Sequence, residues 1–286
     1  MAEDAVLAEG RRWGGHARDW AEIQERTIHP AWHAVLTELP ASPSRSLLDL
    51  GCGAGGFARL AAAHHTRVTG LDASIALVDI ARTRHPAGPF LVGDMERVPF
   101  PTAEFTAVTA FNSLHFARHP ARVVAEAIRV TRPGGRIAVT AWGPLLDCDA
   151  MAYFLDLGGL LPPAPSHAES AADLTDPAAV RRLLARAGLA VGPTRTLSCP
   201  WEYPDLTTAL RGLLSTGPAT AAVSHAGLER VAETITGSIS PYRRPDGSYL
   251  LHNTCFTVIA ALPRVPRAEI LSRGSSAAER RRRSSR

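Results

Sequence analysis

Residues 47–56 read LLDLGCGAGG, an apolar run that ends in four glycines within six positions. Gly51, Gly53 and Gly56 satisfy the GxGxxG fingerprint, in which a strand passes through a tight turn into a helix and the turn lies against a nucleotide. Asp72 follows Gly51 by 21 positions, a spacing that suits a carboxylate accepting both ribose hydroxyls of an adenosine cofactor. The fingerprint by itself fits NAD as well as any other cofactor of that kind.

The residues around this turn alternate between apolar runs and helical patterns, which is typical of a parallel sheet with crossover helices. Ser74 is placed to cap a helix, and Pro133 and Gly134 are placed to end another. The pattern predicts strands at 46–51, 67–73, 89–94, 105–112 and 135–142, and helices at 57–65, 74–84 and 120–131.

The second half of the chain has a different pattern. Asp176 and Pro177 start a helix over 176–189, and strands are expected at 194–201 and 249–262, with a turn around Asp246 and Gly247 leading into the last strand. If these two strands pair, the helices between them form an insertion above the sheet. We therefore predict an α/β fold, with a Rossmann-like, seven-stranded, mostly parallel sheet, helices on both faces, N-terminal helices and a helical insertion before the last strand.

We expect one domain over residues 1–262. Within it, residues 1–44 form an N-terminal helical cover, 45–142 a cofactor-binding core, and 145–175 and 204–240 the segments that cover the substrate. Residues 263–286 have the composition of a disordered basic tail.

The charge distribution excludes one class of partner. The net charge is +4, but eight arginines and two glutamates from Pro263 onward give the tail +6 and leave residues 1–262 with −2. A mildly acidic body argues against a nucleic-acid groove. No apolar run approaches the roughly 20 residues of a membrane span, and no signal peptide is recognisable. We expect a cytoplasmic protein, monomeric or homodimeric, that acts on a small molecule.

The cysteines and histidines do not suggest a metal site. The cysteines lie far apart without a CxxC pair, so we expect buried thiols rather than a zinc site or a disulfide framework. His115 and His119 have i, i+4 spacing, but Pro120 follows and no acidic third ligand lies nearby. The four cysteines are Cys52, Cys148, Cys199 and Cys255.

Charge distinguishes between the possible cofactors. Asp49 lies inside the first strand, two residues before Gly51, where an acid suits a ligand with a nearby positive charge. S-adenosylmethionine carries an ammonium and a sulfonium, whereas the pyrophosphate of NAD would be repelled. The third strand ends in GDMERVPFP (93–101), where Asp94 can accept from an adenine amino group and Met95 can lie on the ring face.

The motifs LLDLGCGAGGFA, GLDAS, GDMERVPFP, NSLHF and RVTRPGGRIAV follow one another in an order and spacing that resemble the class I S-adenosylmethionine-dependent methyltransferases. The subgroup most similar is the small-molecule enzymes like the ubiquinone and menaquinone methyltransferases. The resemblance is strong over about residues 45–142 and weaker elsewhere.

The resemblance implies roles for individual residues. Gly51 and Gly53 would let the backbone approach the methionine portion of S-adenosylmethionine, with Asp49 near its ammonium. An N-terminal helix would cover the amino-acid end of the cofactor. The remaining implied contacts are Asp72 at the ribose, Asp94 and Met95 at the adenine, Phe111 and Asn112 at the methionine chain, and Trp20 and Arg26 on the covering helix. Ala73, which follows Asp72, is a further expected cofactor-binding residue.

A sulfonium is already an activated methyl donor, so such an enzyme must chiefly align the acceptor and exclude water. His115 is the candidate base, because the fourth strand ends above the expected position of the methyl group; a structural role for it stays open. We predict methyl transfer to a small hydrophobic or aromatic metabolite, first at oxygen and then at carbon or nitrogen, with S-adenosylhomocysteine as product. The alternatives are a nicotinamide-dependent oxidoreductase, a cofactor-binding cyclase or rearrangement enzyme that transfers no methyl group, and a binding-only protein.

Overall fold

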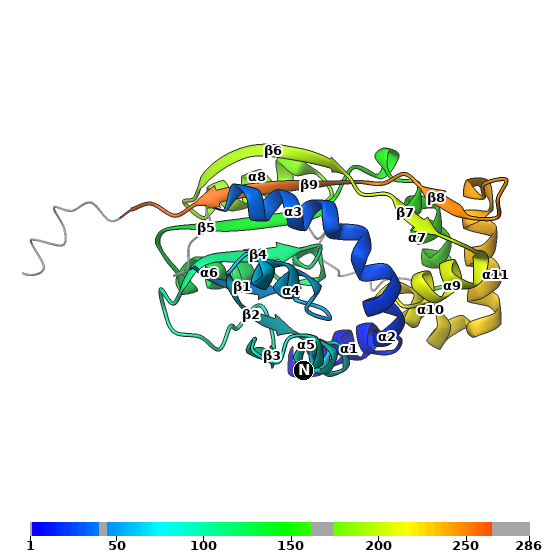
Figure 1. Cartoon of the computed structure of the whole chain (residues 1–286), viewed down its shortest axis with the longest axis horizontal. Helices are drawn as coiled ribbons and strands as arrows, with labels where there is room; N and C mark the ends of the chain where they lie inside the picture. Colours follow the sequence, from blue (N-terminus) through cyan, green and yellow to red (C-terminus); the bar gives the residue numbers. More distant parts are fainter. Residues whose placement is uncertain (1, 40–44, 162–173, 265–286) are drawn as a thin grey trace, which may run out of the picture.

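The computed structural model describes residues 2–39, 45–161 and 174–264, and its centre is a seven-stranded sheet (Figure 1). The strand order is β3-β2-β1-β4-β5-β9-β6. Strands β3, β2, β1, β4 and β5 are parallel, and β9 runs antiparallel to both of its neighbours, β5 and β6. The predicted Rossmann-like architecture is therefore confirmed. The strands are β1 (Ser46–Leu50), β2 (Arg67–Asp72), β3 (Phe90–Val92), β4 (Phe105–Phe111), β5 (Thr131–Trp142), β6 (Ala190–Ser198), β7 (Trp201–Tyr203), β8 (Tyr249–Leu251) and β9 (Thr254–Ala261).

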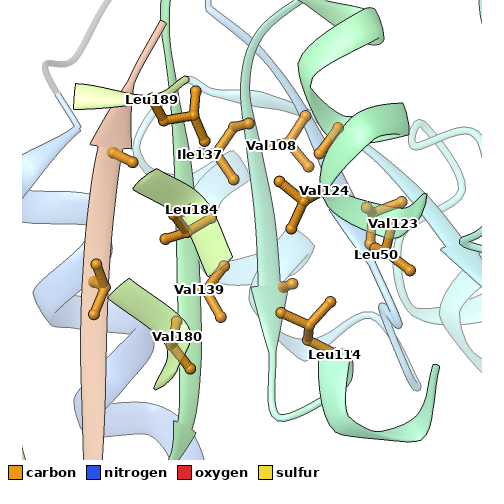
Figure 2. Close-up of a cluster of buried hydrophobic side chains, with 14 of the residues drawn as sticks. Leu50, Val108, Leu114, Val123, Val124, Ile137, Val139, Val180, Leu184 and Leu189 are labelled. Atoms are coloured by element: carbon orange, nitrogen blue, oxygen red, sulfur yellow. The ribbon is translucent and has the colours of Figure 1, made fainter. Parts of the chain in front are cut away.

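Helices cover both faces of the sheet because side chains alternate along each strand. On one face, Leu48 and Leu50 pack in one cluster with side chains of α6 and α8. Figure 2 shows Leu50 beside Val123 of α6 in this cluster. On the other face, Leu47 packs with α3, α4 and α5. Asp49 lies two residues after Leu47 in β1, so its side chain points to the same face of the sheet. The helices of the two layers are α3 (His29–Glu38), α4 (Gly56–Ala63), α5 (Ile75–Arg84), α6 (Pro120–Val130) and α8 (Pro177–Arg186).

Local capping explains where two of these helices begin. The Ser74 hydroxyl accepts a hydrogen bond from the Leu77 N–H at the start of α5, as predicted. The Asp176 carboxylate accepts one from the Ala178 N–H at the start of α8.

The helical insertion lies beyond the carboxyl ends of the parallel strands (Figure 1). The N-terminal segment runs between the sheet and the insertion (Figure 1). It comprises α1 (Ala2–Gly14), α2 (Ala17–Asp19), a π-helical turn η1 (Trp20–Gln24) and a 3₁₀ turn η2 (Glu25–Ile28) before α3. The insertion contains α9 (Leu206–Leu214), α10 (Gly217–Ala226) and α11 (Leu228–Ile239), against which α7 (Ala150–Gly158) packs. Short 3₁₀ turns complete the described elements: η3 (Leu114–Phe116), η4 (Leu145–Asp147) and η5 (Ser240–Tyr242).

Three predicted boundaries were wrong. The strand predicted at 249–262 is two strands, β8 and β9, which belong to different sheets, and the strand predicted at 194–201 is β6 followed by β7. β7 and β8 pair with each other as a separate two-stranded sheet. The TRPGG segment lies inside β5, which starts at Thr131, and the pairing of β5 with β4 is irregular there.

Some predictions concern residues outside the described ranges. These are most of the tail, from residue 265 onward, and residues 162–173 of the expected substrate cover. In the described part of the chain, no helix combines the length and apolarity needed to cross a bilayer.

Candidate active site

A cavity of about 350 Å³ lies at the carboxyl ends of β1, β2 and β4. The glycine turn and the end of β4 form one wall, and the N-terminal segment and the insertion contribute the others. Of the twelve residues predicted for the site, all but Arg26 and Asp94 line this cavity: His115, Trp20, Asp49, Gly51, Gly53, Asp72, Ala73, Met95, Phe111 and Asn112.

The glycine turn is held against β2 and the end of β4. The Gly51 N–H donates to the Leu71 carbonyl at 2.8 Å, and Gly51 has a φ of +75°. A Cβ at position 51 would collide with the Cβ of Ser113. Only glycine combines this backbone conformation with so close an approach.

Asp72 joins the end of β2 to the turn. One carboxylate oxygen accepts from the Gly53 N–H at 2.9 Å, and the other accepts from the Ser74 N–H at 2.8 Å. Burial raises the pKa of Asp72, while the hydrogen bonds from backbone amides oppose that rise. Because each carboxylate oxygen has a second lone pair, Asp72 can still accept a hydrogen bond from a ligand at each oxygen.

Asp49 is buried beneath the turn. Its carboxylate accepts from the Thr109 hydroxyl at 2.7 Å across the β1–β4 pair. Burial raises the pKa of Asp49 to about 7; the Thr109 bond opposes the rise, and the charges of Asp72 and Glu25 add to it. A cation bound in the cavity would stabilise the ionised form of this carboxylate.

Glu25 is a third carboxylate at the turn, and it comes from the N-terminal segment. Its Oε1 accepts from the N–H groups of Ala54 and Gly56 at 3.0 and 3.2 Å. Its Oε2 forms an ion pair with Arg84 at 2.7 Å. Burial raises the pKa of Glu25, and Arg84 and the two amides lower it by less.

Glu25, Asp49 and Asp72 thus place three carboxyl groups around the turn, of which Glu25 is paired with Arg84. The thiol of Cys52 lies among them, and its pKa is raised well above the ordinary value, first by burial and then by the three carboxylates. Such a thiol stays protonated and is not a nucleophile. Carboxyl groups in these positions favour a cationic ligand over an anionic one.

Apolar side chains line the cavity beside Asp72. Ala73, Leu77 and Met95 line the cavity there. Asp94 does not; one of its oxygens accepts from the Glu96 N–H at 2.8 Å. Arg26 is exposed and points away, toward the Glu202 carbonyl at 3.4 Å.

All five tryptophans of the chain line the cavity: Trp13, Trp20, Trp32, Trp142 and Trp201. Trp142 and Trp201 pack edge to face at 5.4 Å, as do Trp13 and Trp20 at 4.8 Å. The indole N–H groups of Trp20, Trp32 and Trp201 have no hydrogen-bond partner within the described residues. The lining of the cavity is therefore predominantly apolar, with five tryptophans in it.

His115 lies in η3, just after β4, and lines the cavity. Its ring lies 4.1 Å from that of Phe116. Burial lowers the pKa of His115 to about 4, so the imidazole is neutral near pH 7. A neutral imidazole can accept a hydrogen bond, but with so low a pKa it is a weak base.

Sequence reasoning missed Glu25 and Thr109. Thr109 could have been found, because it is a polar residue inside the apolar run of β4. In the pairing of β1 with β4 it lies opposite Asp49. Glu25 could not have been found from the local sequence, because its buried carboxylate pairs with Arg84, which lies 59 positions later.

Comparison with known proteins gives a consistent result. Residues 48–139 match the family described as "Methyltransferase domain". The chain is 40% identical over 95 residues to the malonyl-[acyl-carrier protein] O-methyltransferase of Serratia marcescens, a match that covers 33% of this chain and 37% of that enzyme. It is 29% identical over 171 residues to a demethylmenaquinone methyltransferase of Streptomyces griseus, which covers 54% of this chain and 73% of the relative.

Among solved structures, the YcgJ protein of Bacillus subtilis superposes with a TM-score of 0.57 at 17% identity, over 83% of this chain and all of that one. This likeness supports the fold. The match over residues 48–139 agrees with the resemblance seen in the sequence, which is confirmed. The matches to the first curated relatives span between about a third and a half of their length.

Proposed function

We propose that this protein transfers a methyl group from S-adenosylmethionine to a small, hydrophobic or aromatic metabolite, first of all at oxygen. The observation that carries the proposal is the set of three carboxylates, Glu25, Asp49 and Asp72, around a glycine turn that opens into an aromatic cavity. Carboxylates at the turn favour a sulfonium and an ammonium and oppose a pyrophosphate.

The residues present fit the cofactor. Asp72 has lone pairs free for ribose hydroxyls, and Met95 and Leu77 offer apolar surface to adenine. Asp49 supplies the charge complementary to an ammonium. The Trp20 indole N–H has no partner in the described ranges and lies beside Gly53, where it can donate to a cofactor carboxylate. When bound, S-adenosylmethionine supplies an activated methyl group.

The chain's own contribution is alignment and exclusion of water. The tryptophan walls give an acceptor a dry, shaped pocket. His115, neutral at pH 7, accepts a hydrogen bond from the acceptor's hydroxyl and orients it. Because a base with a pKa of about 4 gains little from taking a proton, the site suits acidic acceptors such as phenols, enols or carboxylic acids more than simple alcohols.

Calorimetry with S-adenosylmethionine and with NAD tests the cofactor. We expect saturable binding of the first and none of the second. Incubation of a metabolite extract with methyl-labelled cofactor, followed by mass spectrometry, tests the reaction. A labelled product heavier by a methylene is expected. A product isomeric with its substrate would instead mean a cyclase or rearrangement enzyme, and cofactor binding without turnover on any extract would mean a binding protein.

A further inference from the structure

The backbone N–H groups at the start of α4, where the glycine turn ends, are in the position at which such turns bind an anion. Helix N-termini attract negative charge through unpaired N–H groups and the helix dipole, and in dinucleotide-binding enzymes a pyrophosphate lies there. In this protein the N–H groups of Ala54 and Gly56 already donate to the Oε1 atom of Glu25. The carboxylate of Glu25 thus occupies the position that a phosphate occupies in those enzymes.

Arg84 and Gly56 fit this arrangement. Arg84, at the end of α5, donates to Glu25, to the Ala54 carbonyl and, at 2.6 Å, to the Ala21 carbonyl of the N-terminal segment. A Cβ at Gly56 would come within 2.8 Å of the Glu25 carboxylate and 2.5 Å of the Trp32 ring. The last glycine of the fingerprint therefore makes room for Glu25 and Trp32.

We propose that Glu25 is a positioning and specificity-determining residue: its carboxylate occupies the anion position of the glycine turn, excludes cofactors that carry phosphate there, and fastens residues 17–28 over the cavity. The attachment of residues 17–28 to the turn follows from contacts within the chain alone. The selection against phosphate-bearing cofactors rests on the proposed function.

The N-terminal segment also contacts the helical insertion. Asp19 forms an ion pair with Arg211 of α9 at 2.6 Å, and Gln24 accepts from the buried Tyr203 hydroxyl at 2.7 Å. These contacts hold the segment to the insertion. Among the contacts described for residues 17–28, the direct hydrogen bonds to the turn amides come from Glu25.

The test compares Glu25→Ala and Glu25→Gln with Glu22→Ala. Glu22 is the matched control, because it lies in the same segment but is exposed and approaches Arg211 only at 3.7 Å. The first measurement is hydrogen exchange in the absence of any cofactor. We expect Glu25→Ala to speed amide exchange about tenfold over residues 17–28 and at residues 54–56, since these contacts are lost. Glu22→Ala should match the unchanged protein.

The second measurement is calorimetry with inorganic phosphate. Removing the Glu25 side chain leaves two amides and Arg84 around an open anion position, so Glu25→Ala should bind phosphate saturably, and the unchanged protein and Glu22→Ala should not. Formate should slow exchange in Glu25→Ala back toward the original rate, because it replaces the lost carboxylate. A side chain that only filled space would give neither phosphate binding nor rescue.

The outcomes separate this inference from the proposed function. Phosphate binding to Glu25→Ala supports it even if S-adenosylmethionine never binds. Phosphate binding to the unchanged protein, or unaltered exchange in Glu25→Ala, overturns it even if methyl transfer is demonstrated. If Glu25→Ala proves unfolded by circular dichroism, Glu25→Gln decides by exchange alone, because it keeps the shape but loses the charge and with it the ion pair with Arg84. Exchange over 17–28 that equals the original rate then overturns the proposal.

Discussion

Asp49 should make cofactor binding depend on pH, because it is buried beneath the turn with a pKa of about 7. A bound cation stabilises the ionised carboxylate, so the pKa of Asp49 falls on binding and a proton is released. The affinity must then rise with pH until Asp49 is ionised in the free protein. With a free pKa of about 7, the ionised fraction grows from about one tenth at pH 6 to about one half at pH 7. We expect the affinity for S-adenosylmethionine to rise about fivefold over that unit.

Calorimetry at pH 6.0, 6.5 and 7.0 measures this, and repeating each titration in buffers of different ionisation enthalpy counts the protons released. His115, with a pKa of about 4, stays neutral throughout the window. Asp49→Asn is the control, since an amide keeps the size of the side chain and cannot titrate. It should bind more weakly and lose the slope. A flat affinity in the unchanged protein, or an equal slope in Asp49→Asn, would refute the reasoning.

Three other substitutions test individual contacts. Asp72→Ala should weaken S-adenosylmethionine binding by at least ~1.4 kcal/mol, or tenfold, because charge-assisted hydrogen bonds are lost; an unaltered dissociation constant in calorimetry would remove Asp72 from the site. His115→Ala should lower turnover in a methyl-transfer assay while leaving the cofactor affinity nearly intact, and equal turnover would make His115 structural. Gly51→Ala should lower the free energy of unfolding in urea by about 1–3 kcal/mol, because a methyl group at a φ of +75° collides with Ser113; an unchanged midpoint would mean that the turn relaxes freely.

The sequence predicted the first half of the sheet well because each strand there ends in a recognisable local motif. Glycines, caps and short apolar runs are properties of neighbouring residues, so β1 to β4 and helices α4 and α5 follow from the chain itself. Parallel strands bring their carboxyl ends to one edge, and most of the predicted site residues consequently line a single cavity. Arg26 was the least constrained of them, because a residue of the N-terminal segment can point either into the cavity or away from it.

The second half depended on contacts that no local pattern records. The continuous apolar alternation over 249–262 breaks at Asn253, which is buried. Its side chain accepts from the Ala150 N–H at 2.9 Å and donates to the Leu251 carbonyl at 3.3 Å. These bonds tie the corner between β8 and β9 to α7, about 100 residues earlier in the chain. The corner thus depends on distant partners that could not be known from the sequence alone.

All five tryptophans line one cavity, and this has a practical consequence. Indole emission shifts with the polarity of its surroundings and is quenched by stacked aromatic rings. In most proteins that signal averages over many unrelated positions, but here each emitter borders the same space. The ultraviolet fluorescence of this chain is thus an intrinsic, label-free reporter of occupancy, with which cofactors and candidate acceptors can be ranked before any product is identified.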